Sequence, residues 1–177
     1  MNFNEFGNKI IPGLSSFPRL RARNCIYVDK TARINELAKD RTAKFLSRPR
    51  HFGKSTIVST LEELFRYGTK TRDHDSFFKG LAIEKLWNDE GHYQVLRLDF
   101  KNEFADVYDS SRRFRNRLRK VLENFAASLD ISISPEAHEV SETFEALLSG
   151  LQDNSLVLLI DEYDAPLRCY PKTGQVC

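Results

Sequence analysis

Apolar residues recur at helical spacing in four stretches of the chain. This pattern predicts helices over residues 31–40, 54–68, 110–129 and 134–151. Gly68 follows the second stretch as a typical stop signal. Ser134 as a cap, with Pro135 at the first helical position, is a typical start for the fourth. A further short turn of helix is expected within residues 75–87.

Shorter apolar runs predict four strands, over residues 25–30, 43–47, 93–100 and 155–164. The last run, SLVLLIDEYD, is almost continuously apolar before it ends in acids, which is typical of a strand buried on both faces of a parallel sheet. Residues 1–24 are expected to be loop, because Pro12, Gly13 and Pro18 interrupt any regular pattern. Strands that alternate with helices predict the α/β class.

Composition narrows the class of protein. Hydrophobic residues make up 41% of the 177 residues, which is enough for a real core and for one domain with a short extension. Lys and Arg number 27 against 25 Asp and Glu, a net charge of +2. This near balance gives no argument for a nucleic-acid-binding protein from net charge, so any basic patch must be local.

Cysteine and histidine usage excludes two classes of site. Cys25, Cys169 and Cys177 are too few and too scattered for a disulfide framework or a zinc site, and the four histidines show no ligand spacing. The chain shows no secretory leader and no apolar run of the ~18–20 residues that a membrane span needs. We therefore expect an intracellular, cytoplasmic protein with no membrane contact.

The stretch SRPRHFGKST, residues 47–56, ends like a phosphate-binding loop, G-x-x-x-x-G-K-[ST]. Gly53, Lys54 and Ser55 supply the end, whereas the position of the first glycine holds Arg48. Gly53 would let the backbone approach a phosphate, Lys54 would reach the β- and γ-phosphates, and the Ser55 hydroxyl would coordinate Mg²⁺. Since these three residues also occur together by chance at helix starts, a second element is needed.

The run LVLLIDEYD supplies that element, because it has the form of a Walker B strand. Asp161, at the carboxyl end of the strand, would hold Mg²⁺, and Glu162 would polarise the attacking water. Ligand-binding groups lie at the carboxyl ends of strands in such sheets. Acids can also simply end a strand in solvent, but two half-motifs in the right order and context favour a nucleotide site.

With both elements in place, the chain resembles the predicted AAA-ATPase-like family, P-loop proteins that often carry a carboxyl-terminal PD-(D/E)xK nuclease-like domain. The matching stretches are PGLSSFPRLRARNCIYVDKT, FLSRPRHFGKST, FFKGLAI, YQVLRLDF and LLIDEYDAPL. The resemblance implies that the missing first glycine is a habit of the family, whose loop typically reads RPRRFGKS. His51 departs from that loop and replaces a fixed positive charge.

The resemblance implies ATP and Mg²⁺ as ligands and a P-loop NTPase-like three-layer α/β/α fold with a mainly parallel sheet. Lys54 and Glu162 would be catalytic, and Ser55 and Asp161 would ligate the metal. The nucleotide loop would comprise Arg48, Pro49, Arg50, His51, Phe52, Gly53, Lys54, Ser55 and Thr56. Asp29 and Lys30 lie in an upstream family motif, and their role stays open, although Asp29 or Thr31 could cap the helix that follows.

The carboxyl-terminal side of the implied fold is incomplete. In the implied strand order, 5-1-4-3-2, a later sensor strand would lie between the P-loop strand and the strand that ends at Asp161. No such strand is readable after Asp164. We therefore expect an irregular segment over 1–24, a partial domain over 25–167 and a loose tail over 168–177. The chain would be a truncated member in which ATP hydrolysis is left open, and a partner chain or another copy could complete the sheet.

A basic cluster offers an alternative function. Residues 112–120, RRFRNRLRK, hold six positive charges and could contact nucleic-acid phosphates. The alternative protein would be a catalytically dead remnant that acts as an interaction or nucleic-acid-binding module. No base-stacking aromatics are interleaved on the polar side, which favours the solvated outer face of an amphipathic helix instead.

Overall fold

The computed structural model describes residues 10–40, 42–47, 49, 52–70, 76–89, 91, 93–105 and 111–165. The chain divides into two compact units, residues 1–93 and residues 94–177, each with its own core. None of the helices in these ranges is both long and apolar enough to cross a bilayer. The predicted domain boundaries stay predictions, and the predicted tail, 168–177, lies outside the described residues.

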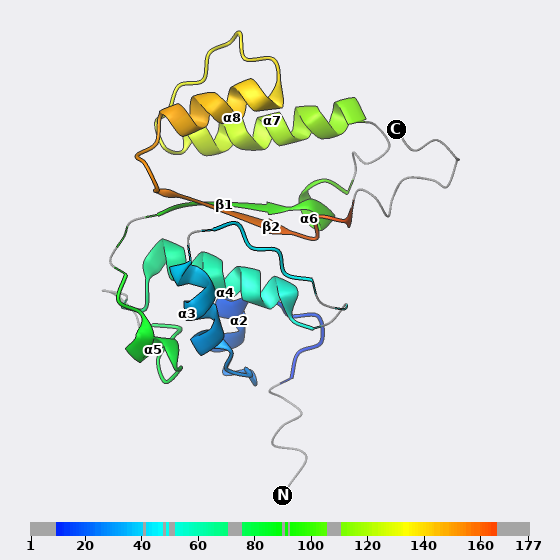
Figure 1. The fold of residues 1–177 in the computed structure, drawn as a ribbon. Helices are drawn as coiled ribbons and strands as arrows, with labels where there is room; N and C mark the ends of the chain where they lie inside the picture. The colour runs from blue at the N-terminus through cyan, green and yellow to red at the C-terminus, as the bar shows by residue number, and fades with distance from the viewer. Residues whose placement is uncertain are drawn as a thin grey trace, which may run out of the picture. The chain divides into compact units, whose positions relative to one another are not determined.

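The first unit is helical in its described part (Figure 1). Its helices are α2 (Phe17–Ala22), α3 (Thr31–Lys39), α4 (Lys54–Tyr67) and α5 (Ile83–Leu86). Helices α3 and α4 confirm the periodicity of their sequences, and Gly68 ends α4 as predicted, since its amide donates to the carbonyl of Leu64. Helix α5 confirms the predicted short turn of helix.

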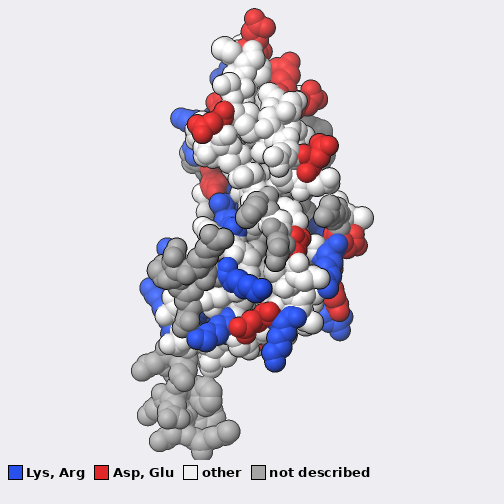
Figure 2. Space-filling view, turned by 90° about the vertical axis from the view of Figure 1, so that its left-hand side faces the viewer, with Lys and Arg blue, Asp and Glu red and all other residues white. Residues whose placement is uncertain are grey.

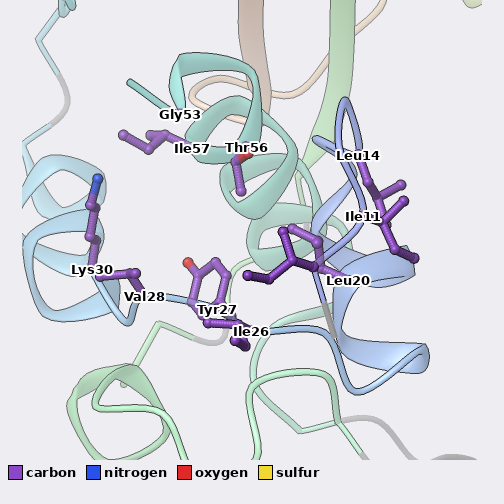
Figure 3. Close-up of a pocket in the computed structure, with 11 residues that line it drawn as sticks. Ile11, Leu14, Leu20, Ile26, Tyr27, Val28, Lys30, Gly53, Thr56 and Ile57 are labelled. Atoms are coloured by element: carbon purple, nitrogen blue, oxygen red, sulfur yellow. The ribbon is translucent and has the colours of Figure 1, made fainter. Parts of the chain in front are cut away.

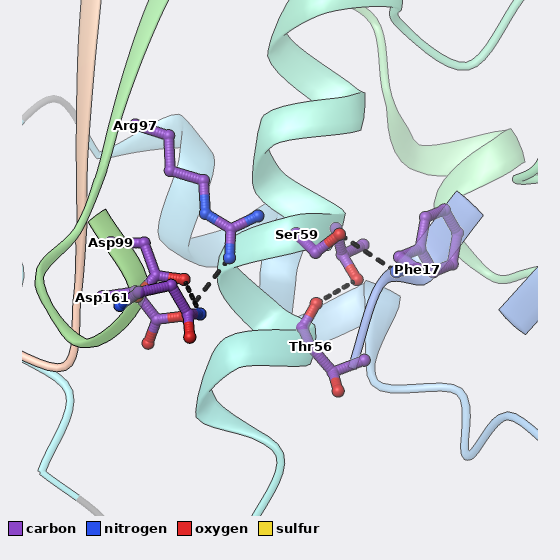
Figure 4. A network of polar contacts seen from close by, with 8 residues as sticks. Phe17, Thr56, Ser59, Arg97, Asp99 and Asp161 are labelled. Atoms are coloured by element: carbon purple, nitrogen blue, oxygen red, sulfur yellow. Dashed lines mark hydrogen bonds and ion pairs between the residues drawn. The ribbon is translucent and has the colours of Figure 1, made fainter. Parts of the chain in front are cut away.

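Helix α2 forms where the sequence pattern predicts loop. Pro18 lies in its first turn, where the missing N–H has no intrahelical partner to lose, so the proline does not oppose the helix. Phe17 is fully buried and its backbone amide donates to the Ser59 hydroxyl of α4, with N and Oγ 3.0 Å apart (Figure 4). The Phe17 ring also packs against the rings of Tyr27 and Phe78, at centroid separations of 5.2 and 4.8 Å. Core packing therefore stabilises α2, which at six residues is too short to be stable by itself.

Two of the predicted strands are wrong. Residues 25–30 and 43–47 are described and form no strand. An isolated β-strand has no partner for its backbone N–H and C=O groups, and the described part of the first unit contains no other strand to supply one. The side chain of Phe45 consequently lies largely exposed instead of in a sheet core.

The second unit contains the sheet. It consists of β1 (Gln94–Asp99), α6 (Phe100–Glu103), α7 (Ser111–Ala127), α8 (Val140–Ser149) and β2 (Leu156–Asp161). The two strands pair in parallel, in a register that runs from Gln94 opposite Leu156 to Asp99 opposite Asp161. Figure 1 shows α7 and α8 together on one face of this pair. Parallel strands with covering helices are compatible with the predicted α/β class, and both strands confirm the apolar runs that predict them.

The helices cover β1 more fully than β2. Leu96 and Leu98 of β1 are buried against α7 and α8, but their register partners Leu158 and Ile160 of β2 are exposed. The expectation that residues 155–164 form a strand buried on both faces is therefore wrong for the residues that the structure describes. The described sheet has two strands, and β2 carries apolar side chains that these helices leave uncovered.

Helix α8 begins later than predicted. Ser134 does not cap it, because its hydroxyl oxygen accepts from the amide of Glu136 in a local turn. The cap is instead reciprocal: the Glu142 carboxylate accepts from the amides of His138 and Glu139, at 2.8 and 3.0 Å. The hydrogen bonds from Glu139 and His138 hold the pKa of Glu142 below its usual value. Glu142, the third residue of α8, thus fixes the start of this helix.

Candidate functional site

The phosphate-loop candidate lies at the start of α4. Gly53 is the residue before the helix and has φ 78° and ψ 24°, in the left-handed region. A Cβ at Gly53 would meet no atom within 4 Å, so glycine is required there by the backbone angle and not by crowding from the protein. The first turn of α4 contains no acidic residue. The backbone amides of this helix begin directly after Gly53. The geometry suits an anion at the amino-terminal end of the helix.

Lys54 reaches back over the loop from the first position of α4. Its ammonium group donates to the carbonyl oxygen of Pro49, with Nζ and O 3.2 Å apart. Ser55 and Thr56 follow in the same helical turn and are half-buried. The structure thus brings Pro49, Lys54 and their neighbours from residue 52 onward into one loop. The other predicted loop residues, Arg48, Arg50 and His51, lie outside the described part of the chain.

Asp161 lies in the second unit, at the carboxyl end of β2. It is 4% exposed, and Oδ2 accepts from Nη2 of Arg97 on β1 at 3.3 Å (Figure 4). Asp99, at the end of β1, is its register partner. The Asp99 carboxylate accepts from the amide and the side chain of Asn102, at 3.0 and 2.6 Å, and so caps α6. Two carboxylates and one guanidinium thus meet at the carboxyl edge of the sheet.

Sequence reasoning missed Arg97 and Asp99 as neighbours of Asp161. The available signal was a charged residue at alternate positions of the run QVLRLD, since residues two apart lie on the same face of a strand. The partner of those charges depends on which strand lies alongside and in which register, and the sequence states neither.

Glu162 has a strained backbone. Its φ is 53°, a left-handed value that costs a residue with a Cβ on the order of 1 kcal/mol or more. The Glu162 carbonyl accepts from the amide of Ala165 at 2.8 Å, and Ala165 is buried beside Phe104. The turn from Glu162 to Ala165 fixes the backbone directly after Asp161. The predicted metal ligand and the predicted catalytic carboxylate are therefore consecutive residues of one tight corner.

Asp29, whose role the sequence leaves open, is a structural residue. Its Oδ1 accepts from the amide and the hydroxyl of Thr31, at 2.8 and 2.6 Å, and its Oδ2 accepts from the amide of Ala82 at 2.9 Å. The Thr31 hydroxyl oxygen in turn accepts from the amide of Ile83. The N-cap position of α3 is Lys30, and Asp29, one residue earlier, accepts from the first amide of α3 and joins this helix to the start of α5. These bonds connect the YVDKT stretch to the FFKGLAI stretch, which are distant in sequence.

Replacing Asp29 by alanine is expected to lower the free energy of unfolding by about 1–3 kcal/mol, because three donors lose their acceptor. Burial raises the pKa of Asp29, but the hydrogen bonds from Thr31 and Ala82 outweigh it and hold the folded-state pKa below the ordinary value. The stabilisation is thus present above the ordinary aspartate pKa and is lost as the pH falls through the folded-state pKa. Urea denaturation at neutral pH and in acid would show a smaller acid destabilisation in the variant than in the unmodified chain.

Asp40→Ala is the control for this prediction. Its side chain is exposed, and its pKa is lowered to about 2 chiefly by the hydrogen bond from Lys44. Exposed ion pairs are screened by water and contribute little, so the stability should hardly change. Equal effects of the two substitutions would contradict the structural role of Asp29.

The candidate metal ligands are of the right chemical type. Mg²⁺ prefers oxygen donors, and Ser55 in the first unit and Asp161 in the second supply a hydroxyl and a carboxylate. Among the described residues, no group of three or more His, Cys, Asp and Glu side chains is placed to hold a metal ion. The oxygen donors of Ser55 and Asp161 are thus of the type that Mg²⁺ prefers, and their joint role in one metal site stays a prediction.

The basic cluster 112–120 serves partly to hold the second unit together. Arg117 donates to the carbonyl of Glu103, and Arg119 donates to the carbonyl of Ala137 and pairs with Glu123. Figure 2 shows one face of the molecule, on which basic and acidic side chains are interspersed. Contact with nucleic acid stays a prediction that rests on the remaining cations of the cluster.

Comparison with known proteins decides the family. The family model described as predicted AAA-ATPase matches residues 12–175, nearly the whole chain. The chain belongs to this predicted AAA-ATPase family. Membership confirms the resemblance read from the motifs, and it supports a P-loop ATPase-like domain that uses ATP and Mg²⁺.

A curated relative in the comparison is uncharacterized. The chain is 29% identical over 163 residues to the "Uncharacterized protein in vnfD 5'region" of Azotobacter chroococcum mcd 1. The matched region covers 90% of this chain and 30% of that relative, so the chain spans less than a third of the relative's length. No solved structure matches the chain. The predicted truncation and a nuclease-like domain in this AAA-ATPase family member stay predictions.

Proposed function

We propose that the chain is an ATP-binding domain of the P-loop type, with the triphosphate held at the start of α4. The observation that carries this proposal is the left-handed turn at Gly53, followed directly by Lys54 and Ser55 on a 14-residue helix. The family match over residues 12–175 supports it. In the complete fold the sheet would be the middle layer of a P-loop NTPase-like α/β/α arrangement.

Each residue of the loop has a distinct task in this proposal. The amides that begin α4 donate to phosphate oxygens, and Lys54 exchanges its bond to the Pro49 carbonyl for one to the β- and γ-phosphates. Residues Arg48 to His51 add positive charge or bind along the entrance of the loop. The exchange at Lys54 replaces a neutral acceptor by a charged one, which strengthens the hydrogen bond.

Ser55 and Asp161 would hold the metal through a hydroxyl and a carboxylate oxygen. Mg²⁺ bound there supplies positive charge that offsets the charge of the β- and γ-phosphate oxygens. Arg97 orients Asp161 through its ion pair. Glu162 would accept a hydrogen bond from the attacking water and polarise it, as a general base does in in-line hydrolysis.

Hydrolysis depends on more than these residues. The described sheet has two strands, and β2 has exposed apolar residues where a further layer or strand would pack. We propose that further strands, from a longer polypeptide, a partner chain or another copy, complete the sheet and supply a γ-phosphate sensor. In this proposal ATP binding requires the loop alone, whereas ATP hydrolysis requires the completed sheet.

Titration calorimetry of the chain with ATP, with and without Mg²⁺, tests the proposal. Lys54→Ala should weaken ATP binding by about 2–3 kcal/mol, or on the order of 100-fold, because a charge-assisted hydrogen bond to phosphate is lost. Glu162→Gln should leave binding intact, since Glu162 acts on water and not on the nucleotide. Lys79→Ala is the control, because it removes a lysine of the same unit that lies outside the nucleotide loop. Tight ATP binding that survives Lys54→Ala would contradict the proposal.

A further inference from the structure

A buried ion pair lies at the carboxyl edge of the sheet. Asp161, the last residue of β2, is buried, and its carboxylate pairs with the guanidinium of Arg97 on β1 (Figure 4). The residue that is proposed to ligate Mg²⁺ therefore already has a cation beside it. Because a guanidinium and a metal ion that approach the same carboxylate repel each other, the two cations compete for Asp161.

The pair between Arg97 and Asp161 is weaker than an ideal ion pair. Its Nη2 and Oδ2 atoms are 3.3 Å apart, whereas strong charge-assisted hydrogen bonds measure about 2.7–2.9 Å. The Arg97 side chain is also 25% exposed, compared with 4% for Asp161, so water can solvate part of the guanidinium. A long bond to a partly hydrated partner is one that a stronger cation can replace.

Mg²⁺ is a stronger partner for a carboxylate than a guanidinium is. It carries two charges instead of one, and it binds carboxylate oxygens at about 2.0–2.1 Å. Coulomb attraction grows with charge and falls with distance, which favours the metal ion over Arg97. Mg²⁺ gives up its water reluctantly, however, and this cost opposes the exchange. We therefore expect the exchange to be weak with the metal alone and favourable when phosphates supply further ligands.

A second carboxylate lies on the same face of the sheet. Asp99 follows Arg97 by two residues on β1 and is the register partner of Asp161, so all three side chains share one face. The Asp99 carboxylate is held in place by hydrogen bonds from the amide and the side chain of Asn102. A guanidinium released from Asp161 would therefore still have a negative charge nearby, which lowers the cost of breaking the pair.

We propose that Arg97 holds Asp161 until a divalent cation takes its place, and that Arg97 thereby sets the concentration of metal that the site requires. The inference rests on the proposed function in one respect, the role of Asp161 as a metal ligand. In the metal-free chain the ion pair orients the buried carboxylate and offsets its charge. On metal binding, Asp161 exchanges the guanidinium for the ion, and Arg97 turns towards Asp99. Arg97 is thus a positioning residue, which acts on the metal through Asp161.

Binding of Mn²⁺ alone to the full chain, followed by the electron paramagnetic resonance of the ion in solution, tests the exchange without a nucleotide. Mn²⁺ takes the same oxygen ligands as Mg²⁺. Arg97→Gln should bind Mn²⁺ about tenfold more tightly than the unmodified chain, because the competing charge is removed. Arg97→Lys should stay within about threefold of the unmodified chain, since lysine keeps the charge.

Two further variants separate the role of Asp161 from a general effect of charge. Lys120→Gln removes one positive charge from an exposed position of α7 in the same unit, and it should change the Mn²⁺ affinity by less than about twofold. Asp161→Asn combined with Arg97→Gln should abolish the tenfold gain, because the gain requires the carboxylate.

Thermal melts add a readout that a purely structural role of Arg97 would not produce. Without metal, Arg97→Gln should melt below the unmodified chain, because it leaves a buried carboxylate without this counter-ion. Mn²⁺ should then raise its melting temperature more than it raises that of the unmodified chain, since the variant binds the ion more tightly.

A measurement on the unmodified chain covers the case in which Arg97→Gln does not fold. The side-chain Nε–Hε resonance of Arg97, identified by its absence from the spectrum of Arg97→Lys, should shift as Mg²⁺ is added. A resonance that does not move, while the same Mg²⁺ concentrations displace bound Mn²⁺, would overturn the inference.

Two other results would also overturn it. Equal Mn²⁺ affinities of folded Arg97→Gln and the unmodified chain would show that Arg97 does not compete with the metal. A gain that survives Asp161→Asn, or that Lys120→Gln reproduces, would be a general effect of charge. Calorimetry with ATP stays a separate measurement. A Mn²⁺ gain in a chain that binds no ATP would support the exchange and refute the proposed function, whereas ATP binding without the gain would overturn the exchange alone.

Discussion

Replacing Phe17 by alanine is expected to lower the free energy of unfolding of the first unit by about 3–5 kcal/mol, the usual cost of removing a buried aromatic ring. The ring is fully buried between Tyr27 and Phe78, and it closes the core that α2, α3 and α4 share. Since small domains are stable by only about 5–15 kcal/mol, the variant should melt far below the unmodified chain. The single tryptophan, Trp87, lies in this unit, so its fluorescence during urea unfolding measures the change.

Phe52→Ala is the matched control for this prediction. Phe52 is 60% exposed, whereas Phe17 is 0% exposed, and both belong to the first unit. Truncation of Phe52 removes little buried surface, so the unfolding midpoint should hardly move. Comparable destabilisation by the two substitutions would mean that Phe17 does not occupy the core.

The second large effect is expected in the other unit. Leu147→Ala should lower the free energy of unfolding by about 2–5 kcal/mol, through lost transfer free energy and the cavity that remains. Leu147 of α8 is fully buried in the cluster that contains Leu96, Leu98 and Leu122, where the helix packs against α7 and the strands. Far-UV circular dichroism during denaturation would record the loss through the part of the helix signal that comes from α7 and α8.

The neighbouring leucine provides the control. Leu148 follows Leu147 in the same helix and is 44% exposed, compared with 0% for Leu147. Leu148→Ala makes the same chemical change with the same helix propensity, so the difference between the two variants reports burial alone. A Leu148 variant as unstable as the Leu147 variant would show that the two faces of α8 are assigned the wrong way round.

Local periodicity was enough to predict the elements that carry a clear pattern. Helices α4 and α7 and both strands follow the positions of their apolar residues, and Gly68 ends α4 where predicted. Prediction failed where distant contacts decide. Residues 43–47 are as apolar as a strand but have no strand beside them in the described part of the chain, and α2 forms because its buried Phe17 joins a core made by other helices.

The candidate site, too, was only partly predictable from the sequence. The loop and the acidic strand end were predictable, because each is a contiguous motif with a defined chemistry. The partners of these residues were not. Arg97 lies beside Asp161 through the strand register, and Asp29 binds the amide of Ala82, 53 residues away. A cavity of about 380 Å³ beside the start of α4 was also invisible in the sequence, because its wall comes from three separate segments, within residues 10–20, 26–30 and 53–57 (Figure 3).

The backbone at Glu162 creates a conflict between two demands on one residue. Its left-handed φ of 53° favours glycine, so Glu162→Gly is a substitution that relieves strain and destroys a carboxylate in a single step. Where the carboxylate has no use, selection for stability alone therefore favours glycine at this position. A lineage that no longer uses this side chain is expected to acquire glycine. Glutamate is expected to persist only where the carboxylate has a function that outweighs the backbone strain. The identity of residue 162 in each descendant thus indicates whether its lineage still needs the acid.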